Sequence, residues 1–349
     1  QTLSYLAANL INEEYVKDDQ EVLIVTLVNS SVNNFSKRIA GFVKDFGLIP
    51  GLGYRVRTLH GLAHDIVRER PDLVGLDNEF QIIDERETNQ IISSSVDSWI
   101  KNNSHILQMW TKDQHQDFQK GNIRRDWQKT ITSIALNFIR QAKDLQTNAN
   151  EIQLLAKELN FTDPFIEMGC VIYQDYQRSL QFRSAVDFDD LIRLALQALK
   201  SDTDYLARLR ARWPYILEDE AQDSSQIQER ILMLLAGEKG NWVRVGDPNQ
   251  AIYETFTTAS PEYLKSFLQR PDVISRDLPN SGRSSNRIIR LANELIRWTN
   301  QDHPLPALQN ALTLPFIKPT PNGDPQPNPT DKPNGVHLYD QKLTAEKEL

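Results

Sequence analysis

The chain has 349 residues, of which 40% are apolar and 25% charged, a composition that excludes a disordered or fibrous protein and predicts two or three structural units. A single cysteine excludes a disulfide framework and an all-cysteine metal site, and fits a reducing compartment such as the cytoplasm. The net charge of -8 argues against broad adhesion to nucleic acid but not against binding in a groove, and no apolar run is long enough to predict membrane insertion.

The first part of the chain alternates between helical patterns and short apolar runs. Its predicted elements are, in order, a helix at 2–11, a strand at 21–26, a helix at 32–46, a strand at 54–59 and a helix at 61–70. This alternation favours a parallel α/β sheet. The first helical pattern starts at once, after Gln1 and without a capping residue, so we expect the sequence to begin inside an element.

The middle of the chain changes character and then returns to the earlier pattern. From about 78 to 184 glycine is nearly absent and helix-period apolar residues recur, which predicts a helical insertion. After it we expect a helix at 188–199, a strand at 213–217, a helix at 225–236 and a strand at 242–245. Both strands end in loops rich in carboxylates, amides and glycine.

The C-terminal part predicts the start of a new unit. A helix is expected at 284–298, followed by a segment, 304–333, that holds nine of the seventeen prolines and predicts a poorly ordered loop or linker. Residues 335–339 have the pattern of a strand, and residues 344–349 that of the start of a helix.

An acidic run at the end of the third predicted strand is the strongest local signal. Asp219 and Glu220 follow a buried strand, where α/β sheets bind ligands. One carboxylate can hold Mg²⁺ through water while the next orients or deprotonates an attacking water. The alternative is a solvated acidic turn. Glu218 stands at the end of the predicted buried strand, at a position where an apolar residue would be expected.

A second polar run follows the fourth predicted strand. The amide of Gln250, just beyond the strand end, could sense a terminal phosphate, and Tyr253 could stack against a base. Taken alone, the run is a turn and Tyr253 a core aromatic residue.

Together the two runs, DEAQDSS at 219–225 and GDPNQAIY at 246–253, resemble the second and third motifs of UvrD/Rep-type superfamily 1 helicases. Four other segments resemble further motifs of the family in the same order, namely 25–29, 58–61, 186–191 and 278–293. The resemblance extends from residue 1 to about residue 300.

The resemblance implies a RecA-like P-loop NTPase fold with a parallel sheet and an inserted helical subdomain. Residues 1–60 and 186–272 would form the first motor domain, residues 61–185 the helical subdomain, and residues 273–349 the beginning of a second RecA-like domain.

The resemblance also implies roles for individual residues, with ATP and Mg²⁺ as cofactors. Asp219 and Glu220 would form the Mg²⁺ site, Glu220 would activate the hydrolytic water, Gln250 would couple the γ-phosphate to the DNA site, and Arg283 would be an arginine finger. The residues implied to contact DNA are Thr26, Asn29, Thr58, His60, Phe188 and Tyr253. As alternatives, Arg283 is a surface salt-bridge residue, and His60 and Phe188 are core residues.

Departures from the family pattern are equally informative. No G-x-x-x-x-G-K-[ST] loop is present, the fifth and sixth motifs are missing, and Leu27, Thr255, Phe256 and Gly282 replace residues that the family usually has. We therefore expect this chain to bind ATP weakly. The expected parent is a cytoplasmic helicase that moves 3′ to 5′ on single-stranded DNA or 3′-tailed duplexes, with repair or replication proteins as further partners. The alternatives are an ATPase-dead DNA- or partner-binding module and the helicase part of a helicase-nuclease.

Overall fold

The computed structural model describes residues 2–106, 121–238, 240–251, 260–332 and 335–337. The chain forms two compact units, one of Gln1–Asp247 with Ala251–Leu264 and one of Pro248–Gln250 with Lys265–Leu349. Within the described residues, no helix combines the length and the apolar character needed to cross a membrane.

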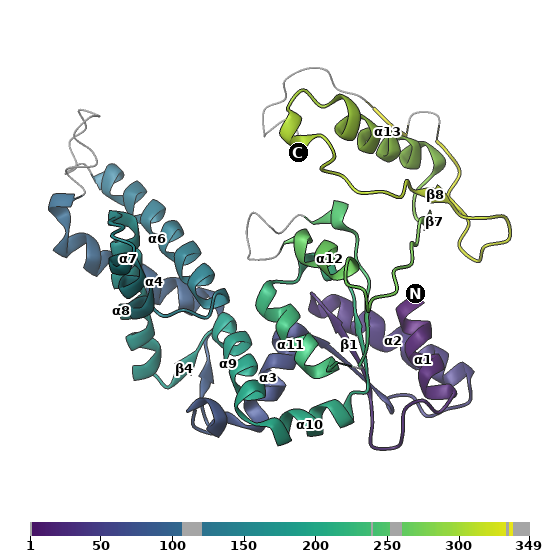
Figure 1. Cartoon of the computed structure of the whole chain (residues 1–349), viewed down its shortest axis with the longest axis horizontal. Helices are drawn as coiled ribbons and strands as arrows, with labels where there is room; N and C mark the ends of the chain where they lie inside the picture. Colours follow the sequence, from purple (N-terminus) through teal and green to yellow (C-terminus); the bar gives the residue numbers. More distant parts are fainter. Residues whose placement is uncertain (1, 107–120, 239, 252–259, 333–334, 338–349) are drawn as a thin grey trace. The chain divides into compact units, whose positions relative to one another are not determined.

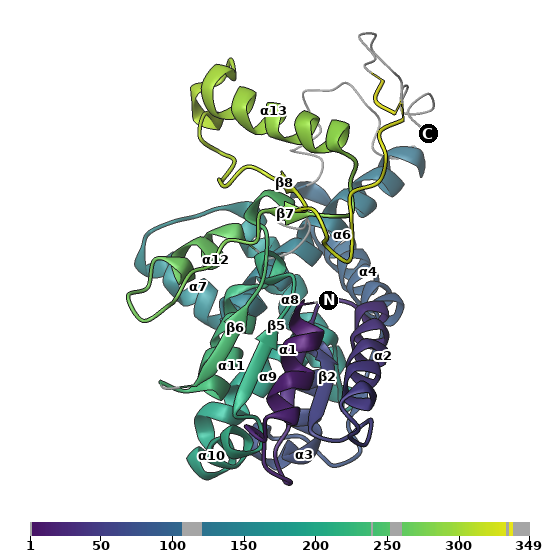
Figure 2. The same ribbon diagram turned by 90° about the vertical axis from the view of Figure 1, so that its right-hand side faces the viewer.

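The first unit is built on a sheet of four parallel strands. They are β1 (Val22–Thr26), β2 (Tyr54–Thr58), β5 (Tyr215–Glu218) and β6 (Asn241–Arg244). Their order is β2-β1-β5-β6. β5 and β6 lie side by side in Figure 2. In this register Thr26 pairs with Thr58, and Glu218 pairs with Arg244, so the carboxyl ends of all four strands meet at one edge.

Helices cover both faces of this sheet. One core contains residues of α1 (Thr2–Asn12) and α2 (Asn29–Asp45) together with Val22 and Ile24 of β1. The opposite core contains Leu23 and Val25 and residues of α3 (Leu59–Glu69), α9 (Phe188–Ser201), α10 (Thr203–Arg212) and α11 (Gln226–Ala236). Because successive side chains of β1 enter opposite cores, its five residues are all buried, as the uninterrupted apolar run predicts.

The helical insertion has a core of its own. The described helices of the insertion are α4 (Glu85–Asn102), α6 (Gly121–Asp144), α7 (Ala149–Glu158) and α8 (Pro164–Phe182), which form one group in Figure 1. Capping boxes at Asp84 and Asn148 start α4 and α7, and Asp163 caps α8.

Two short strands stand where the chain enters and leaves this helical group. β3 (Gln81–Ile82) pairs in parallel with β4 (Ala185–Val186). Phe80 belongs to the core beside the sheet, whereas Ile83 belongs to the core of the helical group. α3 also packs with the sheet, and the core of the helical group begins near Ile83.

The second unit contains α13 (Asn286–Asp302), short β7 (Asn280–Ser281) and β8 (Lys318–Pro319), which pair in parallel, and the 3₁₀ helices η4 (Pro248–Gln250) and η5 (Pro306–Leu308). α12 (Pro261–Leu268) comes before β7 in the chain.

The described part of the proline-rich segment is mostly loop, as predicted. Asparagine amides hold it in place: Asn293 donates to the carbonyl of Ile317 at 2.8 Å and accepts from its N–H at 2.9 Å. Asn300 makes the same pair of bonds with Leu312. The predicted strand at 335–339 is absent over residues 335–337, and its remainder, like the predicted helix at 344–349, lies outside the described residues.

Candidate functional site

The predicted site residues of the first unit lie at the carboxyl edge of the sheet or beside it. Thr26 and Thr58 end β1 and β2, and Asp219 with Glu220 follows β5. Asp247 follows β6, the neighbour of β5. In open α/β sheets this edge is where ligands bind.

Backbone hydrogen bonds hold the loop after β5 to the strands on both sides. Asp219 N donates to the carbonyl of Val25 at 2.9 Å, and Ala221 N donates to that of Val245 at 3.0 Å. The side chain of Gln222 is buried, and its Oε1 accepts from the N–H of Asp247 at 3.1 Å. A shift of either loop is therefore transmitted to the other.

Glu220 has an unusual backbone conformation in this loop. Its φ of 55° and ψ of 42° lie in the left-handed region, where a residue with a Cβ is disfavoured by about 1–2 kcal/mol. It precedes the 3₁₀ helix η3 (Ala221–Asp223), and Gln222 Nε2 donates to its carboxylate at 2.8 Å. Such strain persists where the surrounding structure fixes it, often at functional sites.

The electrostatics of the loop favour a cation. Burial, followed by the neighbouring charge of Glu220, raises the pKa of Asp219, and the same two causes raise the pKa of Asp223. A bound cation would relieve this repulsion. Within the described residues, no three His, Cys, Asp or Glu side chains are placed to hold a metal ion. This donor set fits Mg²⁺, which keeps several waters and needs only one or two carboxylates beside a phosphate.

His60 and Phe188, two residues predicted to contact DNA, come together in the fold. His60 lies in the first turn of α3 and Phe188 begins α9. Their rings meet edge to face, with centroids 6.0 Å apart and an angle of 86° between the planes. Phe188 is 45% exposed, and burial lowers the pKa of His60, which keeps its imidazole neutral at neutral pH.

The other predicted DNA contacts differ in their accessibility. Asn29 is exposed at the start of α2. Thr58 caps α3, and its hydroxyl accepts from the N–H of Gly61 at 3.0 Å. Thr26 is buried and its hydroxyl has no hydrogen-bond partner among the described residues, so a direct DNA contact by this side chain would require movement. Tyr253 lies outside the described residues.

The remaining two predicted residues belong to the second unit. Gln250 ends η4 and is exposed. Arg283 is exposed shortly before α13, and within the described residues its guanidinium forms no ion pair, so the surface salt bridge considered as an alternative is not found.

A buried charge network beside the loop explains Glu218. The carboxylate of Glu218 lies 2.8 Å from Arg244 Nε, and Arg244 Nη1 lies 2.9 Å from Glu229 of α11. Ser224 Oγ and Trp242 Nε1 also donate to Glu218, at 2.7 and 3.1 Å. The sequence signal, a charged residue at the end of each of two neighbouring strands, did not reveal that the two would pair.

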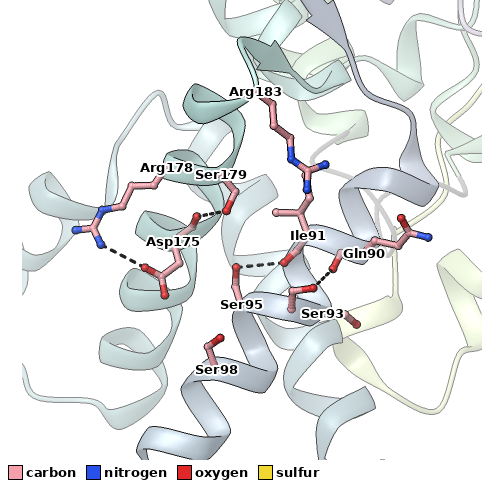
Figure 3. A pocket seen from close by; sticks show the side chains of 10 residues that line it. Gln90, Ile91, Ser93, Ser95, Ser98, Asp175, Arg178, Ser179 and Arg183 are labelled. Atoms are coloured by element: carbon pink, nitrogen blue, oxygen red, sulfur yellow. Dashed lines mark hydrogen bonds and ion pairs between the residues drawn. The ribbon is translucent and has the colours of Figure 1, made fainter.

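A cavity of about 740 Å³ lies elsewhere, between α4 and α8 (Figure 3). Its lining is rich in serine and includes Arg178 and Arg183 but none of the predicted site residues. Ser94 and Ser95 donate their hydroxyls to carbonyls of their own helix, at 2.9 and 3.2 Å. The cavity is separate from the site at the carboxyl edge of the sheet.

Comparisons with known proteins agree with this arrangement. The model of the UvrD/REP helicase N-terminal domain matches residues 1–272. ATP-dependent DNA helicase Rep of Buchnera aphidicola is 27% identical over 82% of this chain and 39% of Rep. ATP-dependent DNA helicase PcrA of Staphylococcus aureus is 25% identical over 86% of this chain and 37% of PcrA. The chain thus spans less than two fifths of the length of these relatives.

Proposed function

The chain belongs to the UvrD/Rep helicase N-terminal domain family, and on this premise we propose that it forms most of the first motor domain, and the start of the second, of an ATP-dependent DNA helicase. The parallel sheet with helices on both faces is RecA-like. In the proposal, the complete protein moves 3′ to 5′ on single-stranded DNA in the bacterial cytoplasm, during repair or replication restart.

One observation carries this proposal. The loops after the neighbouring strands β5 and β6 present Asp219, Glu220 and Asp247 at the same edge, and direct hydrogen bonds through Ala221 and Gln222 join the two loops. In phosphoryl transfer the protein contributes mainly positioning and electrostatic stabilisation, which linked and rigid loops provide.

In the proposed reaction four residues have separate tasks. Asp219 holds Mg²⁺, largely through water, and Glu220 orients the attacking water and accepts its proton. Gln250 senses the γ-phosphate, and Arg283 stabilises charge that develops on the transferred phosphoryl group. Bound Mg²⁺ supplies the positive charge that neutralises the phosphate oxygens.

DNA binding is proposed for the six residues named from the family resemblance, of which all but Tyr253 lie within the described residues. Phe188 and Tyr253 stack against bases, at about 1–3 kcal/mol per base and without regard to sequence, which suits a translocase. Asn29, Thr58 and His60 line the DNA backbone, and Thr26 joins them after a movement that exposes the end of β1.

The test uses the complete gene product and oligonucleotides. The coding region before Gln1 is expected to encode a Gly-rich loop that ends in Gly-Lys-Thr or Gly-Lys-Ser. Single-stranded DNA is expected to stimulate ATP hydrolysis, and duplexes with a 3′ tail, but not a 5′ tail, are expected to be unwound. ATP hydrolysis that single-stranded DNA does not stimulate would overturn the proposal. Unwinding of 5′-tailed duplexes alone would overturn the proposed 3′ to 5′ direction.

A further inference from the structure

Lys143 of α6 is fully buried and joins α6 to the first turn of α9. Its side chain is 1% exposed, and its ammonium lies 2.5 Å from Asp187 Oδ2 and 3.1 Å from Asp190 Oδ2. Burial alone would lower the pKa of Lys143, but Asp190 and Asp187 hold this pKa above its ordinary value. The lysine is therefore charged, and it is the cation on which both carboxylates converge.

The network crosses from one hydrophobic core to another. α6 and α8 contribute to the core of the helical group, whereas α9 contributes to the core beside the sheet. Tyr176 of α8 also donates its hydroxyl to Asp187 Oδ2. The other oxygen of Asp187 caps α9 by accepting from the N–H of Asp190 at 2.8 Å. One carboxylate thus ties α6 and α8 to the start of α9.

The formal charges of the network balance. Lys143 and Arg193 face Asp187 and Asp190, with Arg193 Nη2 3.4 Å from Asp190 Oδ1. A buried balanced network is often no more stable than apolar side chains of the same volume, but removal of one partner leaves an uncompensated charge. Stability alone therefore does not account for this arrangement, and its directional bonds suit the fixing of geometry.

Phe188 directly follows the capping residue Asp187, and its ring meets His60 of α3. We propose that Lys143 is a positioning residue that fixes the first turn of α9 against α6 and α8, and so holds the exposed ring of Phe188 beside His60 in the orientation that stacks on a DNA base. This inference rests on the proposed function. By this inference, the helical subdomain takes part in DNA binding by the motor domain.

The test measures binding of fluorescein-labelled oligo-dT by anisotropy and DNA-stimulated ATP hydrolysis, with the complete gene product. Lys143→Met is expected to raise the dissociation constant and the half-saturating DNA concentration about tenfold, and to leave kcat at saturating DNA near that of the wild type. Lys129→Met is the matched control, since Lys129 is an exposed lysine of the same helix.

A double-mutant cycle separates positioning from general support. If Lys143 acts through Phe188, Lys143→Met costs less than twofold in affinity when Phe188→Ala is already present. A tenfold loss that persists in the Phe188→Ala background overturns the inference, as does an unchanged affinity of folded Lys143→Met. Wild-type protein that fails to bind oligo-dT overturns the proposed function itself, and the inference with it.

A second variant covers the case in which Lys143→Met does not fold. Tyr176→Phe removes only the hydroxyl that donates to Asp187 and keeps the ring. It is expected to weaken oligo-dT binding about threefold in the wild-type background and not in the Phe188→Ala background. Equal affinity of Tyr176→Phe and wild type would overturn the role of the network.

Discussion

Gly246 lies so close to Gln222 that a Cβ at position 246 would be 2.6 Å from Gln222 Oε1. The same Cβ would lie 3.1 Å from the backbone nitrogen of Ala221. The loops after β5 and β6 can therefore approach each other only because residue 246 has no side chain. The hydrogen bond from Asp247 to Gln222 depends on this approach.

Gly246→Ala is expected to separate the two loops. A clash of this kind in a packed site costs about 1–3 kcal/mol, and displacement of the catalytic groups by about 1 Å can cost 10²-fold in rate. We expect kcat for ATP hydrolysis to fall at least tenfold and urea to unfold the variant at a lower concentration. Gly41→Ala is the control, because a Cβ at Gly41 meets open space in the middle of α2, and it should stabilise the protein by about 0.5–1 kcal/mol. Full activity of Gly246→Ala would contradict the coupling of the loops.

In the complete gene product, Glu220→Gln is expected to abolish DNA-stimulated hydrolysis and to leave nucleotide binding intact. The amide keeps the shape of the side chain but cannot accept the proton, which corresponds to a loss of about 10²–10⁴-fold in kcat. Hydrolysis assays and titration with a fluorescent ATP analogue measure the two effects separately. Glu158→Gln, at an exposed position of α7, should change neither. Unchanged turnover in Glu220→Gln would refute the catalytic assignment.

The Glu218, Arg244 and Glu229 network is expected to respond unequally to loss of its members. Arg244→Met leaves the buried carboxylate of Glu218 and the partly buried carboxylate of Glu229 without their shared cation, at a cost of about 3–5 kcal/mol, whereas Glu218→Leu leaves Arg244 paired with Glu229. The double variant Glu218→Leu/Arg244→Met should be more stable than Arg244→Met alone. Urea unfolding of the three variants measures these differences, and purely additive effects would show that the charges do not interact.

Glu21 is expected to make stability depend on acid pH. Burial alone would raise the pKa of this carboxylate, but hydrogen bonds from Arg55 and Trp213, at 2.8 and 3.0 Å, outweigh burial and lower the pKa below 4.5. Because the folded-state pKa is depressed, the stabilisation is present above the unfolded-state pKa and is lost as pH falls through the folded-state value.

The measurement is the free energy of unfolding of wild type and Glu21→Gln between about pH 3 and pH 7. Glu21→Gln should be less stable by about 1–3 kcal/mol at pH 7, since hydrogen bonds to a charged group are lost, and the difference should shrink below about pH 4. A difference that stays constant over this range would rule out Glu21 as its source.

The sequence predicts most helices and strands of the motor core because their signals are local. The apolar run of β1 and the periodicity of α9 and α11 locate these elements to within a few residues. α10 was not predicted. Four of its ten residues are charged. Its buried side, which includes Tyr205 and Leu209, is recognisable only beside α9 and α11.

The candidate site likewise has features that local sequence signals predict and features that depend on long-range packing. The carboxylates after β5 follow from a motif, and the edge where they meet Thr26 follows from the alternation of helices and strands. The pairing of Glu218 with Arg244 and that of Lys143 with Asp187 depend on strand order and helix packing over long sequence separations. Neither pairing has a pattern within a short window of sequence, so neither could be predicted.

The left-handed backbone of Glu220 implies that thermal stability and catalysis select different amino acids at one codon. Glycine adopts this conformation without the steric cost of a Cβ, so a library screened only for resistance to heat should enrich the substitution Glu220→Gly, whereas a library screened for turnover should retain glutamate. Selection by melting temperature alone would thus yield a protein that is more stable to heat but lacks its proposed general base.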